Sequence, residues 1–280
     1  MDNKKLQFVF FGTSDVSKET LDILKDNGYM PSFIVTSPDK PVGRKMLVTP
    51  PLVKIWAEEN NIPYIQPEKL NEEVLERLKS LNSDLFIVVA YGKIMPQELI
   101  QIPKLGSINI HYSILPRWRG ASPVESAILA GDDITGITIQ QMEYKMDAGP
   151  IIALKEVEID KNETAPELRT RLIKIGGDLL VNILPDFIEN KIKTTPQDES
   201  KATYCKKIKK DDGLIVLETE SPSNLFNKFR AYANWPRIFY FKDNKRVIIT
   251  DAVLENNTFI IKRVIPEGKK EVTWEEFNSK

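Results

Sequence analysis

The sequence predicts an α/β protein, with a doubly wound (Rossmann-like), mostly parallel sheet followed by a small helix-plus-β module. Three observations predict this fold class. Short apolar runs end at glycine or turn residues, as buried parallel strands do. Segments with helical periodicity separate these runs, which favours strand–helix–strand units. Beyond residue 210 the pattern changes to closely spaced strand-like segments, which indicates a second module.

The elements of the first part can be placed in chain order. The first strand is expected in LQFVFF (Leu6–Phe11), which stops at Gly12. A helix follows, because Leu21 and Leu24 share a helical face and Asn27-Gly28 is typical of a helix C-terminus. Further strands are expected at 32–36, 84–92 and 107–111, and further helices at 52–61 and 71–82.

Two capping-box patterns mark the next helices. Ser122-Pro-Val-Glu125 predicts a helix that begins at Pro123, and Thr164-Ala-Pro-Glu167 opens a long helix to about Phe187. Strands are expected at 135–142 and 150–159. We expect a catalytic domain over 1–189, a polar linker over 190–210 and a C-terminal module over 211–280. That module holds a short helix near 223–232 and strands at 237–242, 246–253 and 258–265.

Composition narrows the class of protein. The chain has 280 residues, 41% hydrophobic and 28% charged, as ordinary globular proteins do. No apolar run approaches the roughly 20 residues that span a bilayer, and the first run is too short for a signal peptide, so a cytoplasmic protein without membrane contact is expected. One cysteine (Cys205) and one histidine argue against disulfides and a metal site.

Charge is unevenly distributed although the net charge is −1. From Thr203 to the end there are 15 basic and 11 acidic residues, about +4 in total. This basic balance favours a polyanionic partner at the C-terminal end. The first strand is followed by a single glycine rather than Gly-x-Gly-x-x-Gly, so a nicotinamide dinucleotide site is not supported.

The stretch NIHYSILPRWRG (109–120) contains His111, the sole histidine of the chain. Because strand side chains alternate, Asn109 and His111 should lie on one face at the carboxyl end of a strand, where doubly wound sheets bind ligands. An amide N–H can stabilise an oxyanion while an imidazole moves a proton. Asp147, in the loop KMDAGP, is the best candidate to orient His111. From residue types alone, a structural His111 and turn-capping roles for Asn109 and Asp147 stay open.

Linked motifs in this region resemble the 10-formyltetrahydrofolate-dependent formyltransferases. Residues 109–152 match that family's Asn-x-His-x-Ser-Leu-Leu-Pro-x-x-Arg-Gly pattern, with Ile114 in place of the first leucine, and its downstream Thr-Gly-(hydrophobic)-Thr and Asp-x-Gly. Other segments, over most of the chain, are similar to the methionyl-tRNA formyltransferases in particular: FVFFGTSDVSKETLDIL, TSPDKPVGRK, TPPLVKIWAEENNIPYIQPEKL, VVAYGKIMP, ATYCKKIKKDDGLI and NKFRAYANWP.

The resemblance implies a reaction and roles for its residues. The α-amino group of methionine on initiator tRNA would attack the formyl carbon of 10-formyltetrahydrofolate, in the service of translation initiation. Asn109 would stabilise the oxyanion, and His111, supported by Asp147, would transfer the proton. Folate-contacting positions would be Ser113, Ile114, Leu115 and Pro116, together with Val89, Ala90, Tyr91, Gly92 and Ile94; sheet core is the alternative for the second group, above all for Val89.

The same resemblance implies which residues meet the tRNA. The proline-punctuated segment Pro38–Pro51 matches a loop that inserts at the acceptor stem. Its basic residues are Lys40, Arg44 and Lys45, with Arg44 the main candidate for a phosphate contact. Arg117 lies beside the site, and Arg119 is either a tRNA contact or a structural anchor of the Arg-Gly turn. A basic cluster closes the linker: Lys206, Lys207, Lys209 and Lys210. A monomer is expected.

Two features depart from the family pattern, and other functions stay open. Tyr112 replaces a usually small residue after His111, and the C-terminal module is short, like a truncated oligonucleotide-binding (OB-like) barrel. One alternative is a formyltransferase that acts on an amino sugar nucleotide, glycinamide ribonucleotide or another small amine. Others are a folate- or tRNA-binding protein without transferase activity, and a hydrolase that deformylates the folate.

Overall fold

The computed structural model describes residues 6–43 and 46–279, and the chain forms two compact units. The first contains the described residues up to Arg117, with Gly136–Lys155 and Leu172–Ala202. The second contains Trp118–Thr135, Glu156–Arg171 and the described residues from Thr203. The units are interleaved along the chain, and the domain boundaries at 189 and 210 stay a prediction.

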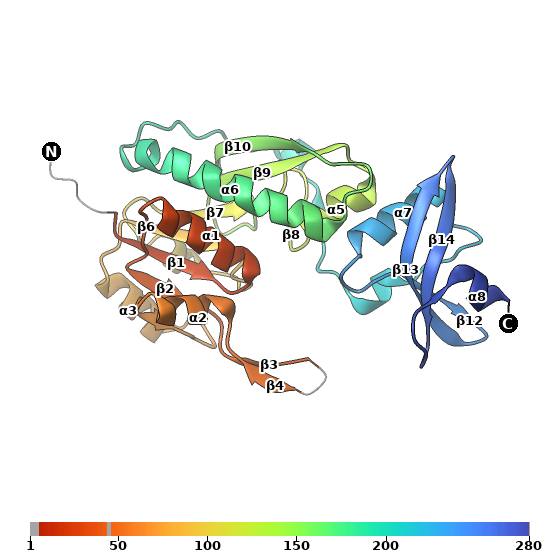
Figure 1. The fold of residues 1–280 in the computed structure, drawn as a ribbon. Helices are drawn as coiled ribbons and strands as arrows, with labels where there is room; N and C mark the ends of the chain where they lie inside the picture. Colours follow the sequence, from red (N-terminus) through yellow and green to blue (C-terminus); the bar gives the residue numbers. More distant parts are fainter. Residues whose placement is uncertain (1–5, 44–45, 280) are drawn as a thin grey trace. The chain divides into compact units, whose positions relative to one another are not determined.

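A seven-stranded sheet of order β10-β9-β7-β6-β1-β2-β5 organises the first unit (Figure 1). Its strands are β1 (Phe8–Gly12), β2 (Phe33–Val35), β5 (Tyr64–Ile65), β6 (Leu85–Val89), β7 (Ser107–His111), β9 (Ile134–Gln141) and β10 (Ile151–Glu158). The five strands from β5 to β7 pair in parallel, and β9 pairs antiparallel to β7. The predicted mostly parallel, doubly wound sheet is confirmed.

Helices cover both faces of this sheet: α1 (Asp15–Asp26), α2 (Leu52–Glu59), α3 (Glu72–Ser80), α4 (Gln97–Ile100) and α6 (Ala165–Ile188). On one face the indole Nε1 of Trp56 donates to Asp22 at 2.8 Å, which joins α2 to α1, and Gly177 of α6 lies against Ile23 of α1. On the other face Leu78 of α3 and Leu99 of α4 belong to the core cluster. Burial on both faces explains the continuous apolar runs.

Of the two predicted capping boxes, one is wrong. Helix α5 (Pro123–Ala130) begins at the predicted proline, but the Ser122 side chain caps nothing and Glu125 is paired with Arg169 instead. A carboxylate gains more interaction energy from a guanidinium in a partly buried position than from the N–H groups of an exposed helix end. At the start of α6 the carboxylate of Glu167 accepts from Thr164 N at 2.9 Å and Thr164 Oγ1 at 2.7 Å.

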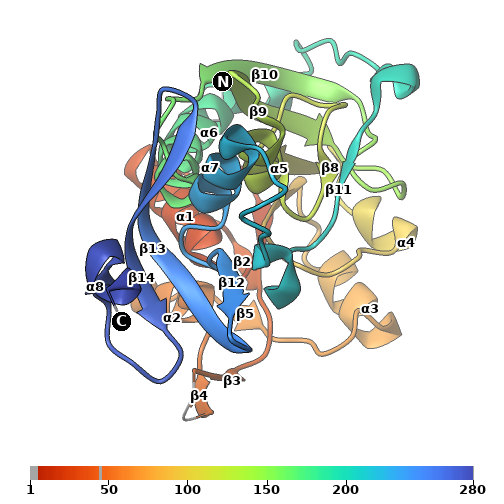
Figure 2. The ribbon, with the colours of Figure 1, turned by 90° about the vertical axis from the view of Figure 1, so that its right-hand side faces the viewer.

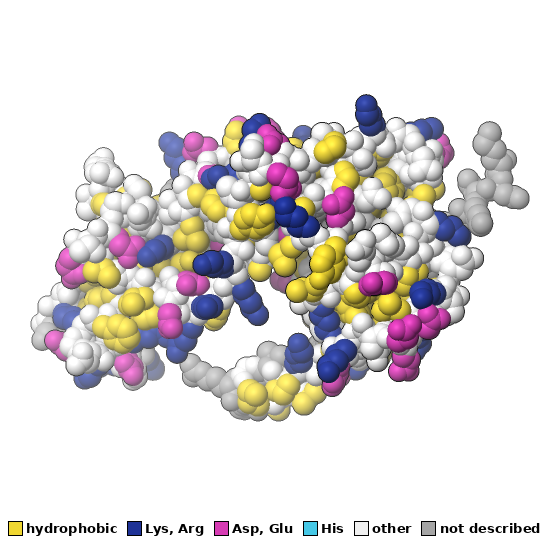
Figure 3. Space-filling view, turned by 180° about the vertical axis from the view of Figure 1, so that it is seen from behind, with side chains coloured by type: hydrophobic (Ala, Val, Ile, Leu, Met, Phe, Trp, Pro, Cys, Tyr) yellow, Lys and Arg dark blue, Asp and Glu magenta, His cyan; other side chains and the backbone are white. Residues whose placement is uncertain are grey.

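The segment expected to be an irregular loop forms a hairpin of β3 (Lys40–Val42) and β4 (Leu47–Thr49). Arg44 and Lys45 lie outside the described residues. Met46, Leu47 and Val48 are 66%, 64% and 69% exposed, and Figure 3 shows apolar side chains on this projecting segment. An apolar surface of this kind on a projecting hairpin favours an interaction role.

The second unit contains an antiparallel sheet of order β12-β13-β14-β15, with β13 and β14 side by side over most of their length (Figure 2). Its elements include β8 (Arg119–Gly120), β11 (Tyr204–Cys205), η2 (Lys210–Gly213), α7 (Pro222–Ala231), β12 (Phe239–Lys242), β13 (Lys245–Glu255), β14 (Thr258–Pro266), β15 (Val272–Thr273) and α8 (Trp274–Asn278). The short helix and three main strands of the C-terminal module are confirmed. None of the described helices combines the length and apolar character that a membrane span requires.

A short parallel pair of strands within the second unit was not predicted. β8 pairs with β11, which lies inside the expected linker, with Gly120 opposite Cys205. Gly120 has φ 118°, and a Cβ there would collide with the Cys205 carbonyl oxygen. Only glycine allows the two backbones to approach this closely.

Candidate active site

The register of three strands gathers polar groups at the carboxyl end of β7. Asn109 lies opposite Val88 of β6 and Gln140 of β9, and His111 lies opposite Thr138. The strand places Asn109 and His111 on one face, as alternation predicts. One amide N–H of Asn109 donates to the Val88 carbonyl at 3.0 Å, which fixes the plane of the side chain. An amide nitrogen carries a second N–H, which can serve a ligand.

His111 faces Asp147 at close range. The imidazole Nδ1 lies 3.6 Å from Asp147 Oδ2, and His111 as a whole is 6% exposed. A carboxylate at this position sets the direction of the ring. The structure therefore brings together the three residues that the sequence proposed as a catalytic trio.

Two glutamines hold Asp147 in this position. Gln140, which is 2% exposed, donates from Nε2 to Asp147 Oδ1 at 3.0 Å, and the same nitrogen lies 3.5 Å from Asn109 Oδ1. Gln197 donates from Nε2 to the carbonyl oxygens of Asp147 at 2.9 Å and Gly149 at 2.7 Å. One amide thus fixes the carboxylate and the other fixes the backbone that carries it.

Sequence reasoning missed both glutamines. Gln140 was readable in principle, since Thr138 and Gln140 alternate with Ile137 and Ile139 along the strand. Gln197 lies 50 residues from Asp147, in a polar stretch without periodicity, and no local pattern marks it.

Two hydroxyl groups fix the turn after His111. Thr138 Oγ1 donates to the Ser113 carbonyl at 2.7 Å and accepts from Leu115 N at 3.1 Å. Ser113 Oγ donates to the Arg117 carbonyl at 2.6 Å. Ile114 and Pro116 are half-buried beside the buried Leu115. The predicted folate-contacting turn is therefore rigid and lies directly after the strand that carries His111.

The second predicted folate segment divides between core and surface. Val89 and Tyr91 are buried, and the Tyr91 ring packs edge-on against Phe11 at 5.5 Å. Burial raises the pKa of Tyr91 to about 12. Ala90 and Gly92 are exposed with φ 46° and 77°, and Ile94 is 75% exposed. The side chains of Val89 and Tyr91 therefore belong to the core, and their carbonyls accept from Ser17 Oγ at 2.7 Å and Thr13 Oγ1 at 3.2 Å.

Tyr112 does not crowd the site. Its ring packs beneath α6, where an added Cβ at Gly176 would lie 3.4 Å from Tyr112 Cε1. Burial raises the pKa of the Tyr112 hydroxyl. Tyr112 is adjacent to His111 and turns to the opposite side, so the helix glycine accommodates the ring that departs from the family pattern.

The predicted tRNA residues occupy separate places. Lys40 is exposed on β3, and Arg117 is exposed after the turn. The cluster after β11 is exposed at all four positions: Lys206, Lys207, Lys209 and Lys210. Arg119 is fully buried, its Nη1 lies 3.4 Å from the Tyr204 hydroxyl, and its guanidinium lies over the Tyr204 ring. Because Arg119 is buried, it fits the structural anchor role and not the tRNA contact. Over the described ranges, no group of three or more potential metal-ligating side chains is found.

Comparison with known proteins identifies the family of the chain. The profile of the family described as "Formyl transferase" matches residues 4–184, and "Formyl transferase, C-terminal domain" matches residues 207–260. Methionyl-tRNA formyltransferase of Sulfurihydrogenibium sp. (strain YO3AOP1) is 40% identical over 255 residues, which is 90% of this chain and 82% of that protein. The Thermotoga maritima protein of the same name is 41% identical, over 86% and 77% of the two chains.

Solved structures show the same fold. The N-formyltransferase from Helicobacter canadensis, in complex with folinic acid and dTDP-3-aminofucose, matches with a TM-score of 0.69 at 19% identity, over 90% of this chain and 88% of that one. At that identity the match bears on the fold alone. The family profiles and the relatives at about 40% identity decide the family: the chain belongs to the formyl transferases and, within them, to the methionyl-tRNA formyltransferase family.

Proposed function

We propose that this chain transfers the formyl group of 10-formyltetrahydrofolate to the α-amino group of methionyl-initiator tRNA, in the service of translation initiation. The observation that carries the proposal is the gathering of Asn109, His111 and Asp147 at the carboxyl end of β7, with 3.6 Å between imidazole and carboxylate. The relatives of the same family are named for this activity, and the chain spans 82% and 77% of the two that are compared above.

The residues present fit a formyl donor. A formyl group carries one carbonyl oxygen that needs a donor and one carbon that must be reached by an amine. Asn109 offers an N–H on the same strand face as the imidazole of His111, and the rigid turn from Ser113 to Pro116 borders them. A donor and a proton-transfer group that share a face are what acyl transfer to an amine requires.

The cosubstrate supplies the formyl group as an amide of its own N10 nitrogen. His111 takes the proton that the attacking amine loses as the new C–N bond forms, and returns it to the N10 nitrogen as the old C–N bond breaks. Asn109 donates an N–H to the formyl oxygen while negative charge develops there. The Asp147 carboxylate stabilises the imidazolium between the two proton transfers. No net proton is gained or lost by the protein.

The hairpin β3–β4 and the basic cluster after β11 are the proposed contacts with the tRNA. Lys40 on the hairpin and Lys207 in the cluster are exposed cations, which suit phosphate contacts. A cytoplasmic location and a monomeric state belong to the same proposal.

The test is formyl transfer by the purified chain from 10-formyltetrahydrofolate to charged initiator methionyl-tRNA. Wild type should catalyse transfer, His111→Ala should retain only a small residual rate, and Glu73→Ala, which changes an exposed residue of α3, should behave as wild type. An amino sugar nucleotide is offered in parallel. Transfer to the sugar and none to the tRNA would contradict the proposed substrate, while hydrolysis of the donor without transfer would contradict the proposed reaction.

A further inference from the structure

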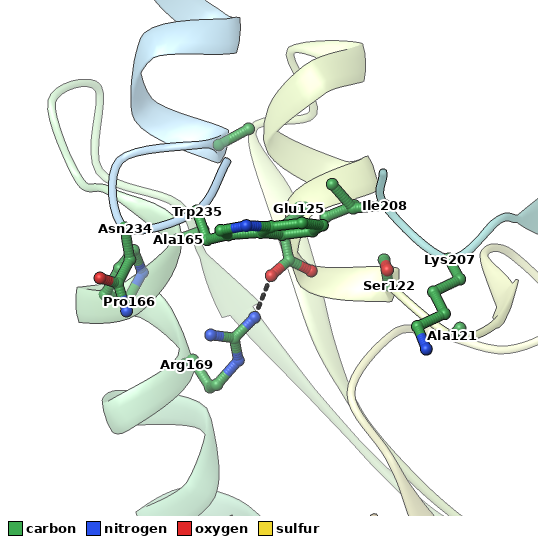
Figure 4. A pocket seen from close by; sticks show the side chains of 11 residues that line it. Ala121, Ser122, Glu125, Ala165, Pro166, Arg169, Lys207, Ile208, Asn234 and Trp235 are labelled. Carbon is green, nitrogen blue, oxygen red and sulfur yellow. Dashed lines mark hydrogen bonds and ion pairs between the residues drawn. The ribbon is translucent and has the colours of Figure 1, made fainter. Parts of the chain in front are cut away.

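A cavity of about 320 Å³ lies within the second unit, and none of its lining residues belongs to the trio. It is bounded by α5, the first turns of α6, the segment after β11 and the loop after α7. Figure 4 shows the indole of Trp235 lying across the cavity, the carboxylate of Glu125 directly beneath it, and the Arg169 side chain reaching up to that carboxylate. The volume falls within the range of small-ligand sites.

Trp235 offers a stacking surface. It is 55% exposed, although a tryptophan is among the side chains that gain most from burial. Asn234 and Lys207 also line the cavity, and Figure 4 shows Lys207 to one side of the indole. An exposed aromatic face in a cavity with a basic side chain is the arrangement with which proteins hold unpaired bases.

The polar groups of the cavity select the kind of ring. Glu125 is 9% exposed, and its carboxylate accepts from Arg169 Nη2. A carboxylate accepts more than one hydrogen bond and cannot donate, so a ligand that approaches it must present an N–H. Cytosine, adenine and guanine carry an exocyclic amine, which uracil lacks. Glu125 therefore favours an amine-bearing base.

The charge of the lining selects an anion. Its ionisable side chains are one carboxylate, Glu125, and two cations, Arg169 and Lys207, so one positive charge is left over. Lys207 lies at the side of the cavity, where Figure 4 shows its ammonium group beyond the edge of the indole. A phosphate attached to a stacked base would be attracted to that position.

We propose that this cavity binds one unpaired nucleotide whose base carries an exocyclic amine, with the base stacked on Trp235, an amine N–H donating to a Glu125 carboxylate oxygen and the phosphate held by Lys207. The nucleotide belongs either to a single-stranded segment of the tRNA substrate or to a free nucleotide. The first source rests on the proposed function, and the second does not.

The experiment uses the full chain and two readouts. Calorimetric titration measures binding of 5′-CMP, 5′-AMP and 5′-UMP, and steady-state kinetics measure the KM for methionyl-tRNA. Trp235→Leu should weaken mononucleotide binding, or raise the KM for methionyl-tRNA, by roughly 5- to 150-fold, the range that corresponds to one stacked base. Trp235→Phe should recover most of the lost affinity. Glu125→Gln should reduce the preference for CMP and AMP over UMP. Phe241→Leu, which replaces an equally exposed aromatic residue of the same unit outside the cavity, is the matched control.

The outcomes separate the two sources. Mononucleotide binding that Trp235→Leu abolishes supports a free nucleotide, and a raised KM for methionyl-tRNA without mononucleotide binding supports the tRNA. The proposal is overturned if neither quantity differs between Trp235→Leu and Phe241→Leu, or if UMP binds as tightly as CMP. If wild type fails to transfer formyl groups, the proposed function fails, and mononucleotide binding still decides whether the cavity is a nucleotide site. Thermal unfolding of Glu125→Gln shows whether loss of its pair with Arg169 has unfolded the unit; the Trp235 variants do not depend on that pair.

Discussion

Gln140→Leu should slow formyl transfer without weakening substrate binding. The substitution removes the donor that lies 3.0 Å from Asp147 Oδ1 and 3.5 Å from Asn109 Oδ1, and it keeps the size and the strand position of the side chain. A hydrogen bond to a charged group is worth about 1.5–3 kcal/mol. If Asp147 acts by stabilising the imidazolium of His111, most of that energy is expressed as charge develops, so kcat should fall roughly 10- to 150-fold.

The assay compares kcat and KM for Gln140→Leu and for Gln141→Leu, the same change one residue further along β9, where the side chain lies on the other face of the strand. The effect should be confined to kcat in the first variant and absent in the second. In a His111→Ala background, Gln140→Leu should cost much less, because residues that act as a unit are not additive. Equal losses in both backgrounds, or equal losses in the two glutamine variants, would refute the view that Gln140 acts through Asp147 and His111.

Three further predictions follow from single residues. Gly120→Ala should destabilise the fold by about 2–4 kcal/mol in urea unfolding, because its φ of 118° and the Cys205 carbonyl both exclude a Cβ; an unchanged midpoint would contradict the β8–β11 pairing. Tyr91→Phe should match the stability of wild type at pH 8 and exceed it at pH 11 by about 1 kcal/mol. The reason is that burial raises the pKa of Tyr91 to about 12, while an unfolded tyrosine ionises near 10. The contribution of Tyr91 to wild-type stability is therefore present below pH 10 and lost as pH rises toward 12. With chemistry rate-limiting, the rate of wild type should change with pH between pH 5 and 9, because proton transfer depends on the protonation state of the transferring group, and a flat profile would rule out proton transfer by His111.

The fold was predictable where burial is complete. β1 and β6 are buried along their whole length, so their apolar runs stand out, and Asn27-Gly28 ends α1 as expected because Gly28 adopts φ 83°. The hairpin β3–β4 escaped prediction because its strands are short and exposed and no buried face imposes alternation. The pairing of β8 with β11 joins residues 85 apart in sequence and rests on the close approach at Gly120, which no local pattern reveals.

The same distinction applies to the candidate site. Asn109 and His111 were predictable as a pair because a strand fixes both side chains on one face, and the register with Gln140 follows only from the pairing of β7 with β9. The capping box at Ser122 failed for the opposite reason: the local pattern was correct, but Glu125 has a tertiary partner in Arg169 that outcompetes a helix cap.

The Asp-x-Gly pattern has a physical reason in this fold. Asp147 must return to His111 from a loop that leaves β9, and it does so with φ 50°, a left-handed conformation that aspartate tolerates better than most residues. Two residues later, Gly149 lies so close to the Gln141 carbonyl that a Cβ would collide with it, and Gln141 N donates to the Pro150 carbonyl at 2.9 Å. The glycine lets the loop fold flat against β9, and Gln197 then fixes the carbonyls of both Asp147 and Gly149. A side chain at position 149 would lift the loop from the strand and carry the Asp147 carboxylate away from the imidazole, so the spacing of the two residues is a condition for the trio to form.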